Sequence, residues 1–248
     1  MAQLYSWGAR ALFIGPAFGL SPHRNAVAVV AIGLQAPFKL SWNERDYRRC
    51  RSALIPPNTL LHLTETSGAM AFLYVDAVSS DYAQLRAFVA TEGERSYLDL
   101  RCESQLLACL NRLRIGGAAS WRDVRAELEG LLKGGTAQAA DVRILRALQI
   151  IHEDPATRLS LAALARHAEL SPSRFTALFR QTTGVPVRRY KLWVAMGAAV
   201  RSMQRGASLT EASMDAGFSS PAHFSSAYRQ MFGMEPSRLA ISLPVAAP

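Results

Sequence analysis

The sequence predicts an α+β protein of two domains, in which a β-barrel or sandwich with following helices precedes an all-α half. Three observations predict this fold class. Short runs of β-branched and aromatic residues, separated by turn residues, fill about residues 10–76. Helical periodicity replaces them from about residue 79. A helix-turn-helix pattern then occurs twice in the second half.

The positive charge of the chain is concentrated in its second half. The 248 residues carry a net charge of +9, and half of them are hydrophobic, so packed domains are expected. From Val142 to the end, 13 Arg and Lys residues stand against 6 Asp and Glu residues, a net charge of +7. A basic domain favours a polyanionic partner.

Cysteine usage and hydropathy favour a cytoplasmic protein. Cys50, Cys102 and Cys109 are odd in number and lack a CxxC spacing, which predicts buried, reduced thiols. No basic start followed by a long apolar stretch marks a signal peptide. The longest apolar run, Ala26–Leu34, is far too short to span a membrane, so no membrane partner is expected.

The first domain is expected over residues 1–135 and begins with strands. A turn at Pro56–Asn58 separates two of the runs with strand character, and closely spaced short strands favour a barrel or a sandwich. A barrel can enclose a small ligand. The predicted strands are Ala11–Ile14, Ala26–Gly33, Phe38–Trp42, Arg51–Ile55, Leu60–Leu63 and Ala69–Val75.

Helices follow these strands over about residues 79–133. Ser79–Asp81 can cap a helix over Tyr82–Ala90, and a longer helix is expected over Glu94–Arg114. A third helix, Ser120–Lys133, is expected to open with a capping box of Ser120 and Asp123. Their apolar stripes serve the barrel, a dimer interface or both. The small residues and glycines that follow predict a linker over 136–141.

The second domain, 142–248, contains the stretch with the sharpest signals. After a helix over Val142–Ile151, Ser160 caps a short helix over Leu161–His167, and a tight turn leads to Ser171–Gln181. Ser171 is a good N-cap, and the proline after it suits the first helical position. This second helix has one apolar stripe and a basic, acid-free opposite face. It is either a solvated amphipathic helix or a recognition helix.

A repeat of this pattern favours the recognition helix. Phe179-Arg180-Gln181, followed by a Gly and a Pro, recurs 49 residues later as Tyr228-Arg229-Gln230, again followed by a Gly and a Pro. The two helix-turn-helix units are expected at about 160–183 and 209–232, with a connector helix at about 187–204. Its length of about 27 Å approaches the roughly 34 Å between successive major-groove segments on one face of DNA.

At this point the chain resembles the AraC/XylS family of bacterial transcription regulators over roughly Val142–Leu239. The signature segment reads AGFSSPAHFSSAYRQMFGMEPSRL. The resemblance implies a seven-helix DNA-binding domain with two helix-turn-helix units. Residues Arg10–Asp76 resemble, more weakly, the cupin-like β-barrel sensor domain of many such regulators, with the helices after it used for dimerisation. The implied partners are double-stranded promoter DNA, RNA polymerase, a small-molecule effector and a second copy of the chain.

The resemblance also assigns roles to residues. The expected DNA-binding residues are the base-facing positions of the two recognition helices and their neighbours on these helices and on the connector. They are Ser171, Ser173, Arg174, Thr176, Ala177, Arg180, Gln181, Arg188, Ser219, Ser220, Pro221, Ala222, His223, Ser226 and Arg229. The chain departs from the family pattern at Ser226, where many relatives have Arg, and at Tyr228, where many have Phe. Few base-facing positions carry the Arg or Lys that reads guanine, so the arginines, Arg189 included, are expected to hold phosphates. We expect the second unit to read weakly, partly through DNA shape.

Catalysis is not expected from this sequence, and neither is a metal or another cofactor. A cupin metal site needs clustered ligands, whereas His23, His62 and Glu65 are dispersed and incomplete. His23 and His62 are instead candidates for lining an effector pocket. Two alternatives stay open: a weakly specific DNA-bending protein whose first domain only dimerises, and, more remotely, a metal-dependent cupin enzyme.

Overall fold

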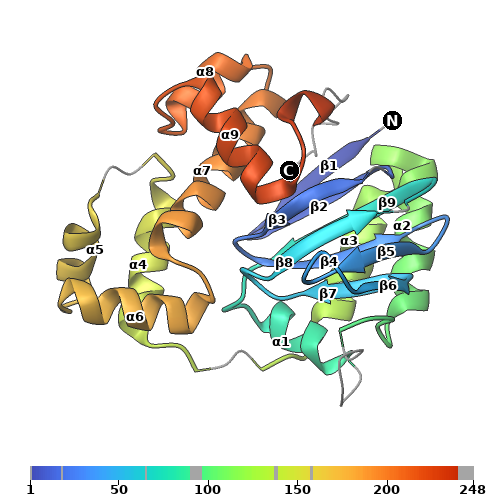
Figure 1. Cartoon of the computed structure of the whole chain (residues 1–248), viewed down its shortest axis with the longest axis horizontal. Coiled ribbons are helices and arrows are strands. Elements are labelled where there is room, and N and C mark those ends of the chain that lie inside the picture. Colours follow the sequence, from blue (N-terminus) through green and yellow to red (C-terminus); the bar gives the residue numbers. More distant parts are fainter. Residues whose placement is uncertain are drawn as a thin grey trace.

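The chain folds into a β-sandwich with helices on one side and a helical C-terminal half beside it (Figure 1). The computed structural model describes residues 2–17, 19–64, 66–89, 97–136, 139–156 and 159–239. Glu65 therefore lies outside the described residues. In Figure 1 the helices α4, α5 and α6 stand to the left of the sheets, α8 and α9 lie above them, and α7 joins the two groups.

The described strands form two antiparallel sheets. The larger sheet has the order β1-β2-β9-β4-β7, and the smaller has the order β3-β8-β5-β6. The bounds are β1 Gln3–Trp7, β2 Arg10–Pro16, β3 Leu20–Arg24, β4 Ala28–Gly33, β5 Phe38–Ser41, β6 Tyr47–Cys50, β7 Ser52–Ile55, β8 Leu60–Thr64 and β9 Ala69–Val75.

Of the barrel and the sandwich that the sequence left open, the structure has the sandwich, because no ladder joins the two sheets among the described strands. The structure is an open sandwich. One buried cluster spans the facing sides of both sheets and includes Phe13 and Phe72 from the larger sheet and Leu40 and Leu63 from the smaller. Packing the inner faces together buries these side chains without closure of the ladder.

Six strands were predictable, and their ends differ from the expected bounds by at most two residues. The three that were missed, β1, β3 and β6, are all sheet edges. Strand β3 contains a proline and an arginine, and β6 contains two arginines. Proline and charge on an edge strand discourage pairing with another chain, so these strands lack the apolar pattern of central strands.

Three helices cover the outer face of the larger sheet: α1 Ser80–Ala87, α2 Glu103–Gly116 and, after a 3-10 turn η1 at Gly117–Ser120, α3 Trp121–Leu132. The apolar faces of helices and sheet form a second buried cluster, which includes Leu12, Leu73, Leu106 and Leu128. The predicted cap of α1 is confirmed, because the Ser79 hydroxyl accepts a hydrogen bond from the Tyr82 amide at 3.2 Å.

Two predicted helix starts in this region are wrong. Leu98, expected within a helix, instead forms an isolated bridge with Ala53, and α2 begins only at Glu103. Ser120 makes no side-chain cap bond, since it ends the 3-10 turn with helical φ and ψ of −90° and −2°. The expected capping box with Asp123 is therefore absent. An N-cap needs extended backbone, which this residue does not have.

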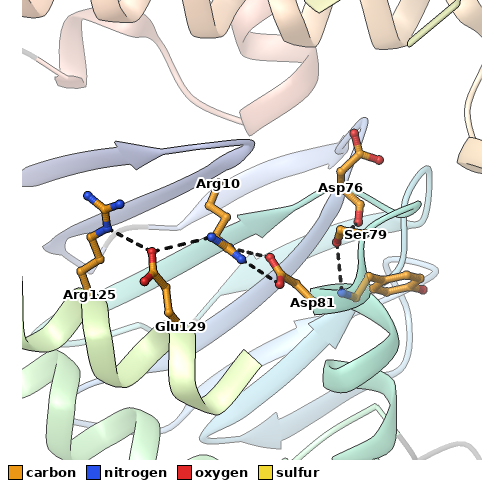
Figure 2. A network of polar contacts seen from close by, with 7 residues as sticks. Arg10, Asp76, Ser79, Asp81, Arg125 and Glu129 are labelled. Carbon is orange, nitrogen blue, oxygen red and sulfur yellow. Dashed lines mark hydrogen bonds and ion pairs between the residues drawn. The ribbon is translucent and has the colours of Figure 1, made fainter. Parts of the chain in front are cut away.

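Ion pairs tie these helices to the sheet (Figure 2). Arg10 of β2 donates Nη2 to the Asp81 carboxylate at 2.9 Å and lies 3.9 Å from Glu129 of α3. Glu129 also pairs with Arg125 at 3.0 Å. Figure 2 shows the Asp76 carboxylate pointing away from this network. That side chain contacts the C-terminal half instead.

The C-terminal half is helical throughout its described part. Six α-helices and a short 3-10 helix stand where the resemblance implies seven helices: α4 Val142–Glu153, α5 Leu161–His167, α6 Pro172–Thr183, α7 Val187–Gln204, α8 Leu209–Asp215, α9 Pro221–Phe232 and η2 Pro236–Leu239. The bounds predicted for α5 and α7 are confirmed. Within the described ranges, no helix combines the length and the apolar character that crossing a membrane requires.

Candidate nucleic-acid interface

The two helix-turn-helix units have the same local geometry. In each, a seven-residue helix leads through a turn into a twelve-residue helix, α5 into α6 and α8 into α9. Glu169 and Gly217 occupy matching turn positions, and both have left-handed backbone with φ of 54° and 87°. Only one copy uses the glycine that this conformation favours. At Gly217 a Cβ atom would also lie 3.1 Å from Ala156 Cα, so space as well as backbone geometry favours glycine there.

Both long helices begin and end as the repeat predicts. The Ser171 hydroxyl accepts from the Arg174 amide at 3.4 Å, and the Ser220 hydroxyl accepts from the His223 amide at 3.1 Å. A proline follows each serine at the start of the helix. Left-handed C-cap glycines end both helices, Gly184 with φ of 79° and Gly233 with φ of 69°. The sequence repeat is therefore a structural repeat.

The expected DNA-binding residues lie largely on exposed surface. All eight from the first unit and the connector are exposed: Ser171, Ser173, Arg174, Thr176, Ala177, Arg180, Gln181 and Arg188. In the second unit Ser219, Ala222, Ser226 and Arg229 are exposed, whereas Ser220, Pro221 and His223 are partly buried. The apolar stripes pack inward, with Phe175 and Phe224 at 0% exposure. The geometry thus leaves one polar face on each long helix for a partner.

Local hydrogen bonds limit what two of these side chains can offer. The Thr176 hydroxyl donates to the Pro172 carbonyl at 2.8 Å, so it presents a methyl group and acceptor lone pairs. His223 Nδ1 lies 3.0 Å from the Ser219 hydroxyl, which fixes the imidazole over the start of α9. Neither residue is thereby arranged as a bidentate base reader.

The charges on the two units differ. Arg174, Arg180 and Arg188 have no ion-pair partner in the part of the chain that the structure describes. Arg229 of α9 instead pairs its Nε with Glu235 at 2.5 Å, with both side chains about half exposed. An exposed pair of this kind contributes little free energy and can exchange for a phosphate. The first unit therefore presents the stronger positive surface.

The connector helix α7 separates the units and leaves a groove between them. A largely apolar groove of about 510 Å³ runs between the units, with Thr176 of α6 and His223 of α9 among its lining residues. The helix has 18 residues, which corresponds to a length of about 27 Å. The two exposed faces are thus held apart by a helix of nearly the length of one turn of DNA.

Polar contacts join the first unit to the N-terminal domain at the start of α7. The Tyr190 hydroxyl donates to the buried Asp76 carboxylate, and His152 Nε2 lies 2.8 Å from the same hydroxyl. Burial, followed by the Asp76 charge, raises the pKa of Tyr190 well above its ordinary value. Arg189 Nη1 donates to Asn58 Oδ1 at 3.2 Å. A buried tyrosine needs a partner for its hydroxyl, but nothing in the sequence indicated Asp76.

The second unit meets the sheets through apolar side chains. Trp193 of α7 and Phe232 of α9 lie against Tyr74 of β9, with ring centroids 5.4 and 5.8 Å away. The core of this unit belongs to the same buried cluster as the interior of the sandwich. One backbone bond, from the Ser21 amide to the Gly233 carbonyl at 3.0 Å, adds to the contact.

The two histidines proposed for an effector pocket lie on the strands β3 and β8. His23 is 4% exposed where β3 meets the end of α9, and a Cβ atom on Gly233 would lie 2.5 Å from its Nδ1. Burial lowers the pKa of His23 to about 4, so the ring is neutral near pH 7. His62 is half-buried on β8, with Nδ1 2.6 Å from the Tyr47 hydroxyl. The two strands are paired, and His62 lies near enough for its charge to act on His23.

A cleft that the sequence did not indicate lies between the β1–β2 hairpin and α7. It measures about 350 Å³, and its walls include Leu4, Trp7, Trp193 and Val200. Arg201 lines it without an ion-pair partner among the described residues, and burial, followed by the Arg205 charge, lowers its pKa. The buried indole N–H of Trp7 also has no hydrogen-bond partner in that part of the chain. Unpaired donors among apolar walls suit an anionic, largely apolar ligand.

The three cysteines are buried free thiols. Burial raises the pKa of Cys50 to about 12 and the pKa values of Cys102 and Cys109 to about 11. Such thiols stay protonated and unreactive near neutral pH. Within the described ranges, no three His, Cys, Asp or Glu side chains are grouped to hold a metal ion.

Comparisons with known proteins show which proteins the helical half is similar to. The family described as "Helix-turn-helix domain" matches residues 164–240. The chain is 33% identical over 106 residues to the HTH-type transcriptional regulator GlxA of Rhizobium meliloti, a match that covers 42% of this chain and 32% of GlxA. It is 31% identical over 106 residues to a putative AraC-like transcription regulator of Streptomyces lividans, covering 42% and 35%. These matches span about a third of the length of each curated relative.

The complete fold is similar to that of ToxT from Vibrio cholerae. The match to ToxT of strain O395 has a TM-score of 0.58 at 13% identity and covers 95% of this chain and 98% of ToxT. A ToxT structure with a bound unsaturated fatty acid matches with a TM-score of 0.56 at 13% identity, covering 96% of both chains. At this identity the likeness concerns the fold alone. The helical half therefore contains a helix-turn-helix domain similar to those of AraC-like transcription regulators, and the chain as a whole has a fold similar to that of ToxT.

Proposed function

We propose that the protein is a transcription regulator that binds double-stranded promoter DNA by placing α6 and α9 in successive major grooves. The observation that carries this proposal is the pair of identically capped helices with exposed polar faces, separated by an 18-residue helix. The excess positive charge of this half supports a polyanionic partner.

Within this interface the first unit reads the sequence more strongly. Ser173, Thr176 and Ala177 face the bases. Arg174, Arg180 and Arg188, which have no ion-pair partner among the described residues, hold phosphates. In the second unit Pro221, Ala222, His223 and Ser226 face the bases. None of these four offers the guanidinium fork that reads guanine, so this unit contributes apolar contacts and a response to DNA shape.

The direct test is a comparison of duplexes at one fixed salt concentration. A duplex obtained by selection with the purified protein should bind about a thousandfold or more tightly than a random duplex of the same length. Arg180→Ala should weaken both complexes. Equal affinity for both duplexes would instead support the weakly specific DNA-bending protein.

The regulator also responds to a small-molecule effector of the apolar carboxylic acid class. Two observations support this part of the proposal. The interdomain cleft combines apolar walls with the unpaired Arg201. ToxT structures of the same fold are described with an unsaturated fatty acid and with (E)-4-(8-methylnaphthalen-1-yl)but-3-enoic acid. A carboxylate would pair with Arg201 while the apolar body of the ligand fills the cleft.

Titration of the purified protein with that naphthalenyl acid, followed by tryptophan fluorescence, tests this proposal, since Trp7 and Trp193 line the cleft. Arg201→Ala should reduce the affinity. Arg205→Ala, which removes a neighbouring exposed charge outside the residues that line the cleft, is the matched control. Equal affinities for the two variants would exclude Arg201 as the carboxylate partner.

Two further partners complete the proposal. The resemblance supports a homodimer formed through the helices of the N-terminal domain and a contact with RNA polymerase at the promoter. Ile115, at the end of α2, is 77% exposed and is the largest apolar exposure in the described part of that domain. Sedimentation equilibrium of the wild-type protein and of Ile115→Asp tests the dimer, which the added charge should weaken.

A further inference from the structure

Two arginines, one from each half of the chain, converge on one loop of the sandwich. Arg24, at the end of β3, donates Nη1 to the Asn58 carbonyl at 2.7 Å. Arg189, in the first turn of α7, donates Nη1 to Asn58 Oδ1 at 3.2 Å. The turn between β7 and β8 therefore holds two guanidinium groups side by side.

No carboxylate among the described residues pairs with these two arginines. Neither Arg24 nor Arg189 has an ion-pair partner in the described part of the chain. Burial, followed by the charge of Arg24, lowers the pKa of Arg189. The charges of Arg189 and His62 also help to depress the pKa of the neighbouring His23, after the larger effect of its burial. Like charges held together raise the free energy of the site, and an anion between them would lower it.

The cation pair lies where α6 ends and α7 begins. A Cβ atom on Gly184, the C-cap of α6, would lie 3.2 Å from Pro57 Cβ, so the same loop touches the end of that helix. The exposed Arg188 precedes Arg189 directly, and the exposed Arg180 lies in the last turn of α6. Positive charge thus continues from α6 across the domain boundary onto the sandwich.

We propose that Arg24 and Arg189 together hold a backbone phosphate of bound duplex DNA, so that the N-terminal domain forms part of the DNA-binding surface. The inference rests on the proposed function. The remaining donors of Arg24 have no partner among the described residues, and a guanidinium matches phosphate oxygens with two parallel bonds. The phosphate would also relieve the repulsion between the two arginines. DNA binding therefore tightens the contact between the first unit and the sandwich.

Salt dependence of binding measures this contact, since each phosphate contact contributes about 0.9 to the slope of log affinity against log salt. The probe is a random duplex of about 30 base pairs, titrated with the full chain between about 50 and 200 mM KCl. Arg24→Ala should flatten the slope by about 0.9 and weaken binding severalfold. Arg24→Lys should keep the slope, because the charge remains.

Arg122→Ala is the matched control, because it removes an exposed arginine of α3 that has no ion-pair partner among the described residues. Its slope should equal that of the wild-type protein. If the salt slope of Arg24→Ala equals that of Arg122→Ala, the inference is overturned. It is also overturned if Arg24→Lys flattens the slope as much as Arg24→Ala does.

Arg180→Ala separates this failure from a failure of the proposed function. If Arg180→Ala flattens the slope and Arg24→Ala does not, DNA binding stands and the role of Arg24 falls. If the wild-type protein binds the duplex without salt dependence, the proposed function falls as well. The melting temperature of each variant should stay at the wild-type value, which ties the change in slope to the lost contact with DNA.

Discussion

The two helix-turn-helix units repeat one local structure but are attached to the N-terminal domain in different ways. The first unit has a core of its own, which includes Ile144, Leu164, Phe175 and Phe179, and it meets the sandwich mainly through hydrogen bonds near the start of α7. The core of the second unit is continuous with the interior of the sandwich. A shared apolar core fixes relative position, whereas a few polar bonds can exchange with water or ligand. The second unit is thus built as an extension of the N-terminal domain, and the first as an attached module.

The largest expected effect comes from matched core phenylalanines. Phe175 and Phe224 occupy the same position in the two long helices, and both are 0% exposed. Either alanine substitution should cost about 3–5 kcal/mol. Hydrogen exchange should show lost protection in both α9 and the strands for Phe224→Ala, but only in α4–α7 for Phe175→Ala. If Phe224→Ala lowered the protection from hydrogen exchange in the second unit alone, the claim that this unit shares its core with the sandwich would be contradicted.

Acid should loosen the second unit. The pKa of His23 falls from 6.5 to about 4 in the folded protein because the ring is buried against α9. The unfolded chain therefore takes up a proton first, and stability is lost as the pH falls from 6.5 towards 4, by up to about 3 kcal/mol. Urea unfolding across this range should show the decline, and His23→Gln should remove most of it. An identical decline in His23→Gln would assign the effect to other groups.

A smaller effect is expected at the attachment of the first unit. Tyr190→Phe removes the hydrogen bonds to Asp76 and His152 and leaves the buried Asp76 carboxylate without that donor. The cost should be about 1–3 kcal/mol. It should appear as faster proteolysis at the start of α7, with unchanged protection of α9. Tyr82→Phe is the matched control at a partly buried tyrosine of α1. Equal loosening of both units would contradict the comparison.

The smallest effect concerns the caps, where the units are alike. Ser171→Ala and Ser220→Ala each remove one side-chain bond to a helix start. Each should cost about 1 kcal/mol, measured by thermal unfolding. Similar values for the two variants would show that the units differ in their attachment and not in their local helix starts.

The repeat was predictable because its signals are local. Serine and proline at the start of α6 and α9, with glycine at the end, act within one turn of helix, so these elements and the connector could be placed from the residues alone. The edge strands β3 and β6 could not be placed in this way, because they owe their strand character to their partners and not to alternation. The convergence of Arg24 and Arg189, 165 residues apart, likewise depends on tertiary packing.

The most direct test of the comparison is a pair of distance distributions from spin labels. Labels would be placed at Arg49→Cys on the sandwich with either Ala162→Cys on α5 of the first unit or Thr210→Cys on α8 of the second unit, all exposed positions, while the buried native thiols stay unlabelled. Without DNA the distance distribution to α8 should be narrow and the one to α5 broad. Saturating duplex DNA should narrow the α5 distribution and leave the α8 distribution unchanged. Equally narrow distributions in the free protein, or an α5 distribution that DNA does not alter, would contradict the account.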